Sequence, residues 1–120
     1  GQVVADTLGG RQFSGIGGAE DFVAGPAYAA DGHSLLCMHS TAMAGDQLVN
    51  RDQLVNRILP QHPPGAVITT PRHQIDVVIT EFGAAELEGL TVRERGHALA
   101  EIAHPQFRDE LRKAADSAQA

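Results

Sequence analysis

A glycine-rich turn near the N-terminus is the first segment whose residue types could do chemistry. Gly15, Gly17 and Gly18 come directly before an acidic, apolar stretch that begins at Ala19. Because glycine has no side chain, backbone N–H groups at the start of a helix can approach a ligand oxygen there, where partial positive charge accumulates. Such donors suit a carboxylate or a developing oxyanion. Gly17 and Gly18 are therefore candidate substrate-binding residues, although an ordinary strand-to-helix turn has the same spacing.

Binding of a dinucleotide or of nucleic acid is disfavoured. The dinucleotide fingerprint G-x-G-x-x-G requires a glycine where Glu20 stands. The formal net charge is −6, with nine Lys and Arg against fifteen Asp and Glu. The overall field therefore repels a polyanion and offers no basic patch for nucleic acid. A phosphate-bearing ligand would have to be held locally.

The six histidines raise the question of a metal site. His97, Glu101 and His104 fall on one helical face, but they lack the H-E-x-x-H spacing that places two imidazoles one turn apart. A polar face in contact with solvent is the better interpretation. No metal is predicted.

Short apolar runs bounded by turn signals predict the sheet that must position these residues. Residues 34–38, 66–70 and 77–80 have the length of buried strands in a parallel sheet, and residues 3–6 predict a further short strand. The chain of 120 residues is 42% hydrophobic but only 4% aromatic, a composition typical of helices packed on a sheet. We predict one α/β domain over residues 1–120, with an open, mainly parallel sheet and flanking helices.

Three helices are predicted around this sheet. Residues 19–30 favour a helix that Gly25 and Pro26 should break or kink. Thr91 and Glu94 have the spacing of a capping box at the start of a second helix. Pro105 should end that helix and begin a third, because proline fits the first helical position. The last two helices are interpreted as packing elements.

A direct repeat lies between the second and third predicted strands. The hexapeptide DQLVNR occupies residues 46–51 and again residues 52–57. One copy of so short a unit cannot build a solenoid, whose periods are about 20 to 50 residues. We interpret it as a duplication tolerated in a surface segment, where it extends a helix or lengthens a loop.

Cys37 is the one cysteine, so no disulfide can form within the chain. It lies in the apolar run LLCM and predicts a buried, inert thiol. No apolar stretch approaches the roughly 20 residues that span a bilayer, and the N-terminus lacks a signal-peptide pattern. We therefore expect a soluble, cytoplasmic protein without membrane contact. The start at Gly1 without Met suggests a piece of a longer chain, although removal of a tag would give the same start.

Several motifs in a fixed order extend over nearly the whole chain. They are a G-x-G-G turn (15–18), S-T-A (40–42), P-G-A-x-x-T-T (64–70), an Arg–Asp segment (72–76), T-E-F-G (80–83) and a long match ending in I-A-H-P-x-F-R (90–108). In this order they resemble the C-terminal domain of the acetyl-CoA hydrolase/transferase family, in particular its class I CoA-transferases of the 4-hydroxybutyrate/acetate type.

The resemblance implies acyl-CoA chemistry through a glutamyl-CoA thioester. Coenzyme A would be a substrate, with no covalently bound cofactor, and a short-chain carboxylate the second substrate. The nucleophilic glutamate of such proteins lies upstream of the matched region, and no part of this chain resembles that segment. The isolated chain is therefore expected to be inactive, to need the N-terminal half of the same protein as its partner, and to form a homo-oligomer.

Site residues follow from the same resemblance. Gly17 and Gly18 would bind the acyl or carboxylate oxygen, and Glu81 would be a supporting catalytic residue that positions a basic residue from the missing half. Coenzyme A would contact Ser40, Thr41 and Arg57.

The family commonly has a lysine shortly after S-T-A. This chain has Met43 and Ala44 there, so Arg51 or Arg57 would have to make the phosphate contact; a solvated arginine is the alternative for both.

A different class of function also fits the sequence. The chain could be a non-catalytic binding or assembly module that pairs with an N-terminal partner. In either case the isolated domain should expose an apolar face, and we expect self-association or a rearranged N-terminal strand.

Overall fold

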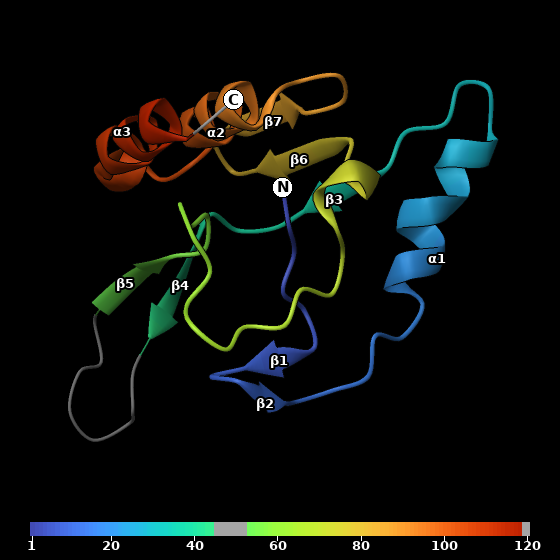
Figure 1. Ribbon diagram of the computed structural model, residues 1–120, viewed down its shortest axis with the longest axis horizontal. Coiled ribbons are helices and arrows are strands. Elements are labelled where there is room, and N and C mark those ends of the chain that lie inside the picture. The colour runs from blue at the N-terminus through green and yellow to red at the C-terminus, as the bar shows by residue number, and fades with distance from the viewer. Residues whose placement is uncertain (45–52, 119–120) are drawn as a thin grey trace.

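A computed structural model of the chain describes residues 1–44 and 53–118. Figure 1 shows two C-terminal helices packed along a small sheet, with two separate strand pairs and one short helix outside that layer. The strands are β1 (Thr7–Leu8), β2 (Arg11–Gln12), β3 (Leu35–Cys37), β4 (Thr41–Ala44), β5 (Gln53–Asn56), β6 (Val77–Thr80) and β7 (Gly83–Glu86). The α-helices are α1 (Ala19–Ala24), α2 (Val92–Glu101) and α3 (Arg108–Ser117), and short 3-10 helices are η1 (Gly25–Tyr28), η2 (Arg72–Gln74) and η3 (Pro105–Phe107).

The main sheet has the order β3-β6-β7. Strands β3 and β6 are parallel, whereas β6 and β7 are antiparallel. The predicted open α/β class is confirmed, and the pairing is mixed where the sequence predicted mainly parallel strands. The cause is the length of the connections. Only Glu81 and Phe82 separate β6 from β7, and a parallel crossover needs a dozen or more residues.

Two of the four predicted strands form as expected. Residues 34–38 contain β3, and residues 77–80 are β6. Residues 3–6 and 66–70 instead share one isolated antiparallel bridge, between Val3 and Thr70. The ladder stops there because the Ala5 amide donates to the Thr69 side chain, at 2.9 Å, in place of a backbone carbonyl.

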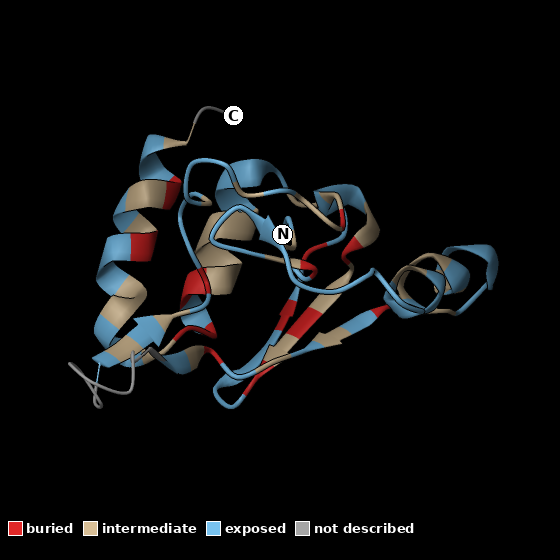
Figure 2. Ribbon diagram, turned by 90° about the horizontal axis from the view of Figure 1, so that it is seen from below, coloured by how far each residue is buried: buried red, intermediate tan, exposed pale blue. Residues whose placement is uncertain are grey.

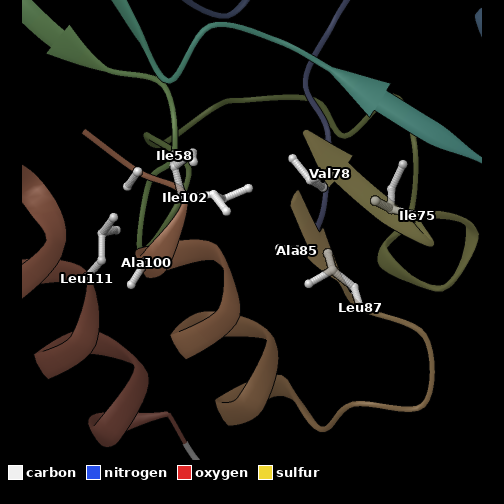
Figure 3. Close-up of a cluster of buried hydrophobic side chains, with 9 residues drawn as sticks. Ile58, Ile75, Val78, Ala85, Leu87, Ala100, Ile102 and Leu111 are labelled. Carbon is white, nitrogen blue, oxygen red and sulfur yellow. The ribbon is translucent and has the colours of Figure 1, made fainter. Parts of the chain in front are cut away.

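The core lies between the sheet and helices α2 and α3 (Figure 3). Its buried members are Ile58, Ile75, Val78, Ala85, Leu87, Ala100, Ile102, Ala103 and Leu111. Helix α2 comes very close to α3, since a methyl group at Gly96 would lie 2.7 Å from the Ala115 Cβ. The predicted C-terminal packing helices are confirmed, including the Thr91–Glu94 capping box and the start of η3 at Pro105.

Helix α1 lies at the margin of this core, against which its half-buried Val23 packs. It ends at Ala24, and η1, which contains Pro26, continues the chain. This is the predicted break at Gly25 and Pro26. None of the residues of α1 is buried, and the views from two directions show it projecting from one end of the molecule (Figures 1 and 2).

The prediction of a buried Cys37 is wrong, because this thiol is exposed. Strand β3 is an edge strand of the main sheet, and successive side chains of a strand face opposite sides. Leu35 and Cys37 therefore share the exposed side, while Leu36 packs against the core. A sequence run that is apolar throughout does not reveal which strand will stand at an edge.

Several other sequence predictions have a structural outcome. The first copy of the hexapeptide repeat and Asp52 lie outside the described residues. Residues 53–56 of the second copy form β5, which is neither the predicted helix nor a loop, and Arg57 follows this strand. His97 contacts Asp116, and Glu101 contacts Arg112. Across the described residues, no three His, Cys, Asp or Glu side chains come together as a potential metal site. The described helices are all too short or too polar to cross a membrane.

Candidate functional site

The carboxylate of Glu81 is held by Ser40 through two hydrogen bonds. Glu81 is in the two-residue turn between β6 and β7, and Ser40 lies just before β4. The Ser40 amide donates to Oε2 at 2.8 Å, and the Ser40 hydroxyl donates to Oε1 at 2.7 Å. Each carboxylate oxygen thus accepts one bond. We call this pair the Ser40–Glu81 clamp.

The parallel pairing of β3 and β6 brings the two residues of the clamp together. The Met38 amide donates to the Ile79 carbonyl at 3.0 Å, so the two strands end at the same edge of the sheet. Residues that follow the carboxyl ends of neighbouring parallel strands meet at such an edge, which is where open α/β sheets place ligands. The Arg57 amide donates to the Ser40 carbonyl at 2.9 Å. The β4–β5 hairpin is therefore attached to the clamp.

The clamp keeps Glu81 negatively charged. The hydroxyl and amide of Ser40 hold the pKa of this carboxyl at about 2, compared with an ordinary value of 4.5. His39 makes a smaller contribution, with its Nδ1 atom 4.0 Å from Oε2. The Glu81 side chain is still 35% exposed. A carboxylate that is weakly basic and engaged at both oxygens is a poor nucleophile, but it can hold a cation.

Aromatic and cationic side chains flank Glu81. The ring centres of Phe82 and His104 are 5.7 Å apart with the rings nearly perpendicular, and the Arg108 guanidinium lies 5.4 Å from the Phe82 ring centre. The Phe82 amide donates to the Thr80 hydroxyl, which donates to the Ile102 carbonyl at 2.6 Å. The turn that carries Glu81 is thereby fixed to the end of α2.

Sequence analysis missed this flank and His39. The H-P-x-F-R segment contains His104 and Arg108 and could have indicated this flank. Its relation to Glu81, however, depends on the contact between the end of α2 and the β6–β7 turn.

The predicted coenzyme A contacts lie beside the clamp. Ser40 is fully buried with its hydroxyl on Glu81. Thr41 begins β4 opposite Asn56 of β5 and is half-buried. Arg57 follows β5 and is exposed. The structure therefore brings Ser40, Thr41, Arg57 and Glu81 together.

The glycine turn is not part of this cluster. Gly17 and Gly18 precede α1, which lies on the opposite side of the main sheet from the β4–β5 hairpin (Figure 1). Gly17 has φ +63°, a left-handed conformation that favours glycine. Both glycines are exposed, as are the residues next to them. Their amides are accessible to a ligand, but at a site separate from the Ser40–Glu81 clamp.

Comparisons with known proteins identify relatives along almost the whole chain. Residues 1–115 match the family model described as acetyl-CoA hydrolase/transferase C-terminal domain. The 4-hydroxybutyrate coenzyme A transferase of Clostridium kluyveri is 41% identical over 111 residues, which are 92% of this chain and 24% of that protein. A probable butyrate:acetyl-CoA coenzyme A-transferase of Syntrophomonas wolfei is 42% identical over 115 residues, covering 96% of this chain and 24% of its own length.

A solved structure has the same fold. The crystal structure of RipA from Yersinia pestis superposes with a TM-score of 0.71 at 38% identity, covering 98% of this chain and 24% of RipA. The chain thus spans about a quarter of the length of these relatives.

Proposed function

The chain belongs to the acetyl-CoA hydrolase/transferase family as its C-terminal domain, and from this premise we propose that the complete protein transfers coenzyme A between a short-chain acyl-CoA and a carboxylate, or hydrolyses acetyl-CoA. The relatives from Clostridium kluyveri and Syntrophomonas wolfei are named for transfer of coenzyme A involving 4-hydroxybutyrate, and butyrate with acetyl-CoA, respectively. Because this chain spans about a quarter of their length, the complete reaction requires residues from the N-terminal half of the protein.

The Ser40–Glu81 clamp is the observation that carries this proposal for the chain itself. Glu81 is fixed by hydrogen bonds of 2.8 and 2.7 Å and has a pKa of about 2. It is therefore suited to hold a basic residue of the N-terminal half in place, and unsuited to attack a thioester. We assign it a supporting role, and we place the nucleophilic glutamate outside this chain.

The proposed reaction proceeds by exchange at that second glutamate. Its carboxylate attacks the thioester carbonyl carbon, and the carbon–sulfur bond breaks to release the thiolate of coenzyme A, which leaves an acyl-glutamyl anhydride. The thiolate then attacks the glutamyl carbonyl, releases the first carboxylate and forms the glutamyl-CoA thioester. An acceptor carboxylate reverses these steps to form the new acyl-CoA, whereas water in its place gives hydrolysis. Each step conserves atoms and requires no oxidant.

The glycine turn and the β4–β5 hairpin complete the proposal. The amides of Gly17 and Gly18 would donate to the acyl or carboxylate oxygen as negative charge develops on it. Thr41 and Arg57, at the base of the hairpin, would contact coenzyme A, with Arg57 supplying positive charge for a phosphate. The hydroxyl of Ser40 is engaged by Glu81, so Ser40 would contribute to this surface by holding the clamp and the hairpin together.

Acyl exchange tests the proposal in the complete protein. Acetyl-CoA with acetate or succinate should give exchange or thiol release, and the isolated chain should give neither. Glu81→Gln should lower kcat on the order of 100-fold, because small misplacements of a reacting group cost about that much. Glu86→Gln, an exposed carboxylate on β7, is the matched control. Full activity in Glu81→Gln would contradict the assigned role, and exchange by the isolated chain would place the nucleophile within it.

A second function is supported by exposed aromatic side chains. Phe13, Phe22 and Tyr28 are 80%, 82% and 92% exposed. Aromatic side chains are enriched where proteins associate, so these residues would suit a binding or assembly module. Light scattering over a wide concentration range should then show self-association of the isolated chain. Association combined with an inactive complete protein would favour this second function over catalysis.

A further inference from the structure

The glycine turn receives almost no support from apolar packing. Residues 11–19 are all exposed, and none of the residues of α1 is buried. At Gly15 and Gly17, an added methyl group would meet no atom of the described residues within 4 Å. A turn whose amides must face a ligand oxygen needs a defined position. Within the described residues, Val23 of α1 packs against the core cluster, and polar contacts fix the chain on both sides of the turn.

Asp6 provides the first of these contacts. It is 8% exposed, and its carboxylate accepts bonds from the Thr69 hydroxyl at 2.6 Å and the Gln12 side-chain amide at 3.0 Å. Its backbone carbonyl accepts from the amides of Phe13 and Ser14, at 2.8 and 3.2 Å. Asp6 thus fixes the chain directly before the turn, through both its side chain and its backbone.

Thr70 provides the second contact. It is 4% exposed, and its hydroxyl donates to the carboxylate of Glu20, which lies in the first turn of α1. The backbone of Thr70 is itself fixed, since the Val3 amide donates to its carbonyl at 3.0 Å. Glu20, which follows the glycine turn, is therefore attached to Thr70, the neighbour of Thr69 in the chain. Two successive threonines hold the two sides of the turn.

We propose that Asp6, Thr69, Thr70 and Glu20 are positioning residues that set the place of the Gly17 and Gly18 amides, and thereby the affinity for the carboxylate substrate. We call these four residues the threonine network. The inference rests on the proposed function, in which those amides bind a carboxylate or acyl oxygen. It adds that binding depends on two hydroxyl groups, those of the half-buried Thr69 and the buried Thr70, that never touch the substrate.

The hydroxyl groups, and not the bulk of the threonines, carry this role. The Thr69 oxygen accepts from the Ala5 amide at 2.9 Å and gives its own proton to Asp6. Valine has nearly the same shape but cannot donate, so it leaves the buried Asp6 acceptor without this bond. Serine keeps the donor and loses one methyl group. The four residues of the network are also separate from the hydrophobic core cluster, so the exchange of a hydroxyl need not unfold the domain.

The kinetic test uses the complete protein with paired substitutions. Thr69→Val and Thr70→Val should each raise KM for acetate or succinate about tenfold, leaving KM for acetyl-CoA within about twofold, because a modest displacement of binding groups is costly. Thr69→Ser and Thr70→Ser should restore the wild-type acceptor KM. Thr7→Val, which removes a hydroxyl outside the network, is the control. An unchanged acceptor KM in both valine variants, or no rescue by serine, would overturn the inference.

An NMR measurement on the complete protein separates this inference from the proposed function. The amide signals of Gly15, Gly17 and Gly18 should shift in the valine variants and return in the serine variants. If the wild-type complete protein shows no acyl exchange, the proposed function fails, but the amide signals still report whether the network sets the turn. If exchange occurs while neither the signals nor the acceptor KM change, only the threonine network is refuted.

Discussion

Replacement of Ser40 by alanine should release Glu81 from its low pKa. Two donors from Ser40 hold that pKa at about 2, compared with an ordinary value of 4.5, and the hydroxyl is the largest single cause. Alanine removes the hydroxyl bond of 2.7 Å and leaves the amide bond of 2.8 Å in place. Ser40 is fully buried, so water cannot readily replace the lost donor. We therefore expect the pKa of Glu81 to rise from about 2 towards 4.5.

Titration of the isolated chain by carbon-detected NMR measures this change at the Glu81 side-chain carboxyl. Thr41→Ala is the matched control, because it removes a neighbouring hydroxyl at the start of β4 that makes no hydrogen bond to Glu81 within the described residues. The control should leave the Glu81 pKa at about 2. A Glu81 pKa that also stays at about 2 in Ser40→Ala would refute the clamp as its cause.

The same substitution should change how stability depends on pH. Because the pKa of Glu81 in the folded chain is below the ordinary value, its carboxylate contributes stability above pH 4.5 that is lost as the pH falls towards about 2. Ser40→Ala should therefore lose less stability than the wild type across this range, measured by the urea midpoint at each pH. Parallel curves for the two proteins would contradict the sign of this effect.

Three further predictions test other parts of the fold. Gly96→Ala should lower the free energy of unfolding by about 1 kcal/mol, because overpacking costs about 1–3 kcal/mol and alanine regains about 1 kcal/mol of helix propensity. Adding Ala115→Gly should then relieve the clash, and urea unfolding that shows simple additivity would disprove the contact. The protonated His33 ring donates from Nδ1 to the Asp76 carboxylate at 2.7 Å, and this bond is the main cause that raises the pKa of His33 above 6.5. The pair therefore stabilises the fold below pH 6.5, and this contribution is lost as the pH rises through the raised pKa. His33→Asn should flatten the corresponding fall in melting temperature, and an unchanged slope would exclude the pair. Thr91→Ala should remove the N-cap of α2 and cost about 1 kcal/mol in urea unfolding, whereas Thr91→Ser should cost little.

Local signals predicted the C-terminal helices, but they failed for the strands predicted at residues 3–6 and 66–70. The Thr91 cap and Pro105 act on their own neighbours in sequence, so their effect does not depend on the rest of the fold. Residues 66–70 have the composition of a strand, but whether they pair depends on what lies beside them. There the Thr69 hydroxyl accepts the Ala5 amide and ends the ladder. Such competition between side chain and backbone is invisible in a search for apolar runs.

The candidate site was predicted in composition but not in arrangement. Glu81 and Ser40 were both singled out through the family resemblance, in separate roles. Their contact depends on the parallel register of β3 and β6, in which Leu35 lies opposite Val77. No local pattern fixes that register. The separation of the glycine turn from the clamp likewise depends on where α1 lies relative to the sheet.

The three carboxylates around the candidate sites share one mode of stabilisation. Glu81 is held by the hydroxyl of Ser40, and Asp6 and Glu20 by those of Thr69 and Thr70. A hydroxyl donor stabilises an anion without cancelling its charge, whereas an arginine neutralises it.

The arginines of the C-terminal helices pair elsewhere, Arg93 with Asp116 and Arg112 with Glu101. Within the described residues, neither Lys nor Arg lies within ion-pair distance of Glu81. In a chain with a net charge of −6, the described residues thus hold this carboxylate by hydrogen bonds and place no Lys or Arg beside it. This arrangement is what the proposed role of Glu81 requires, in which the rest of the complete protein supplies the cation.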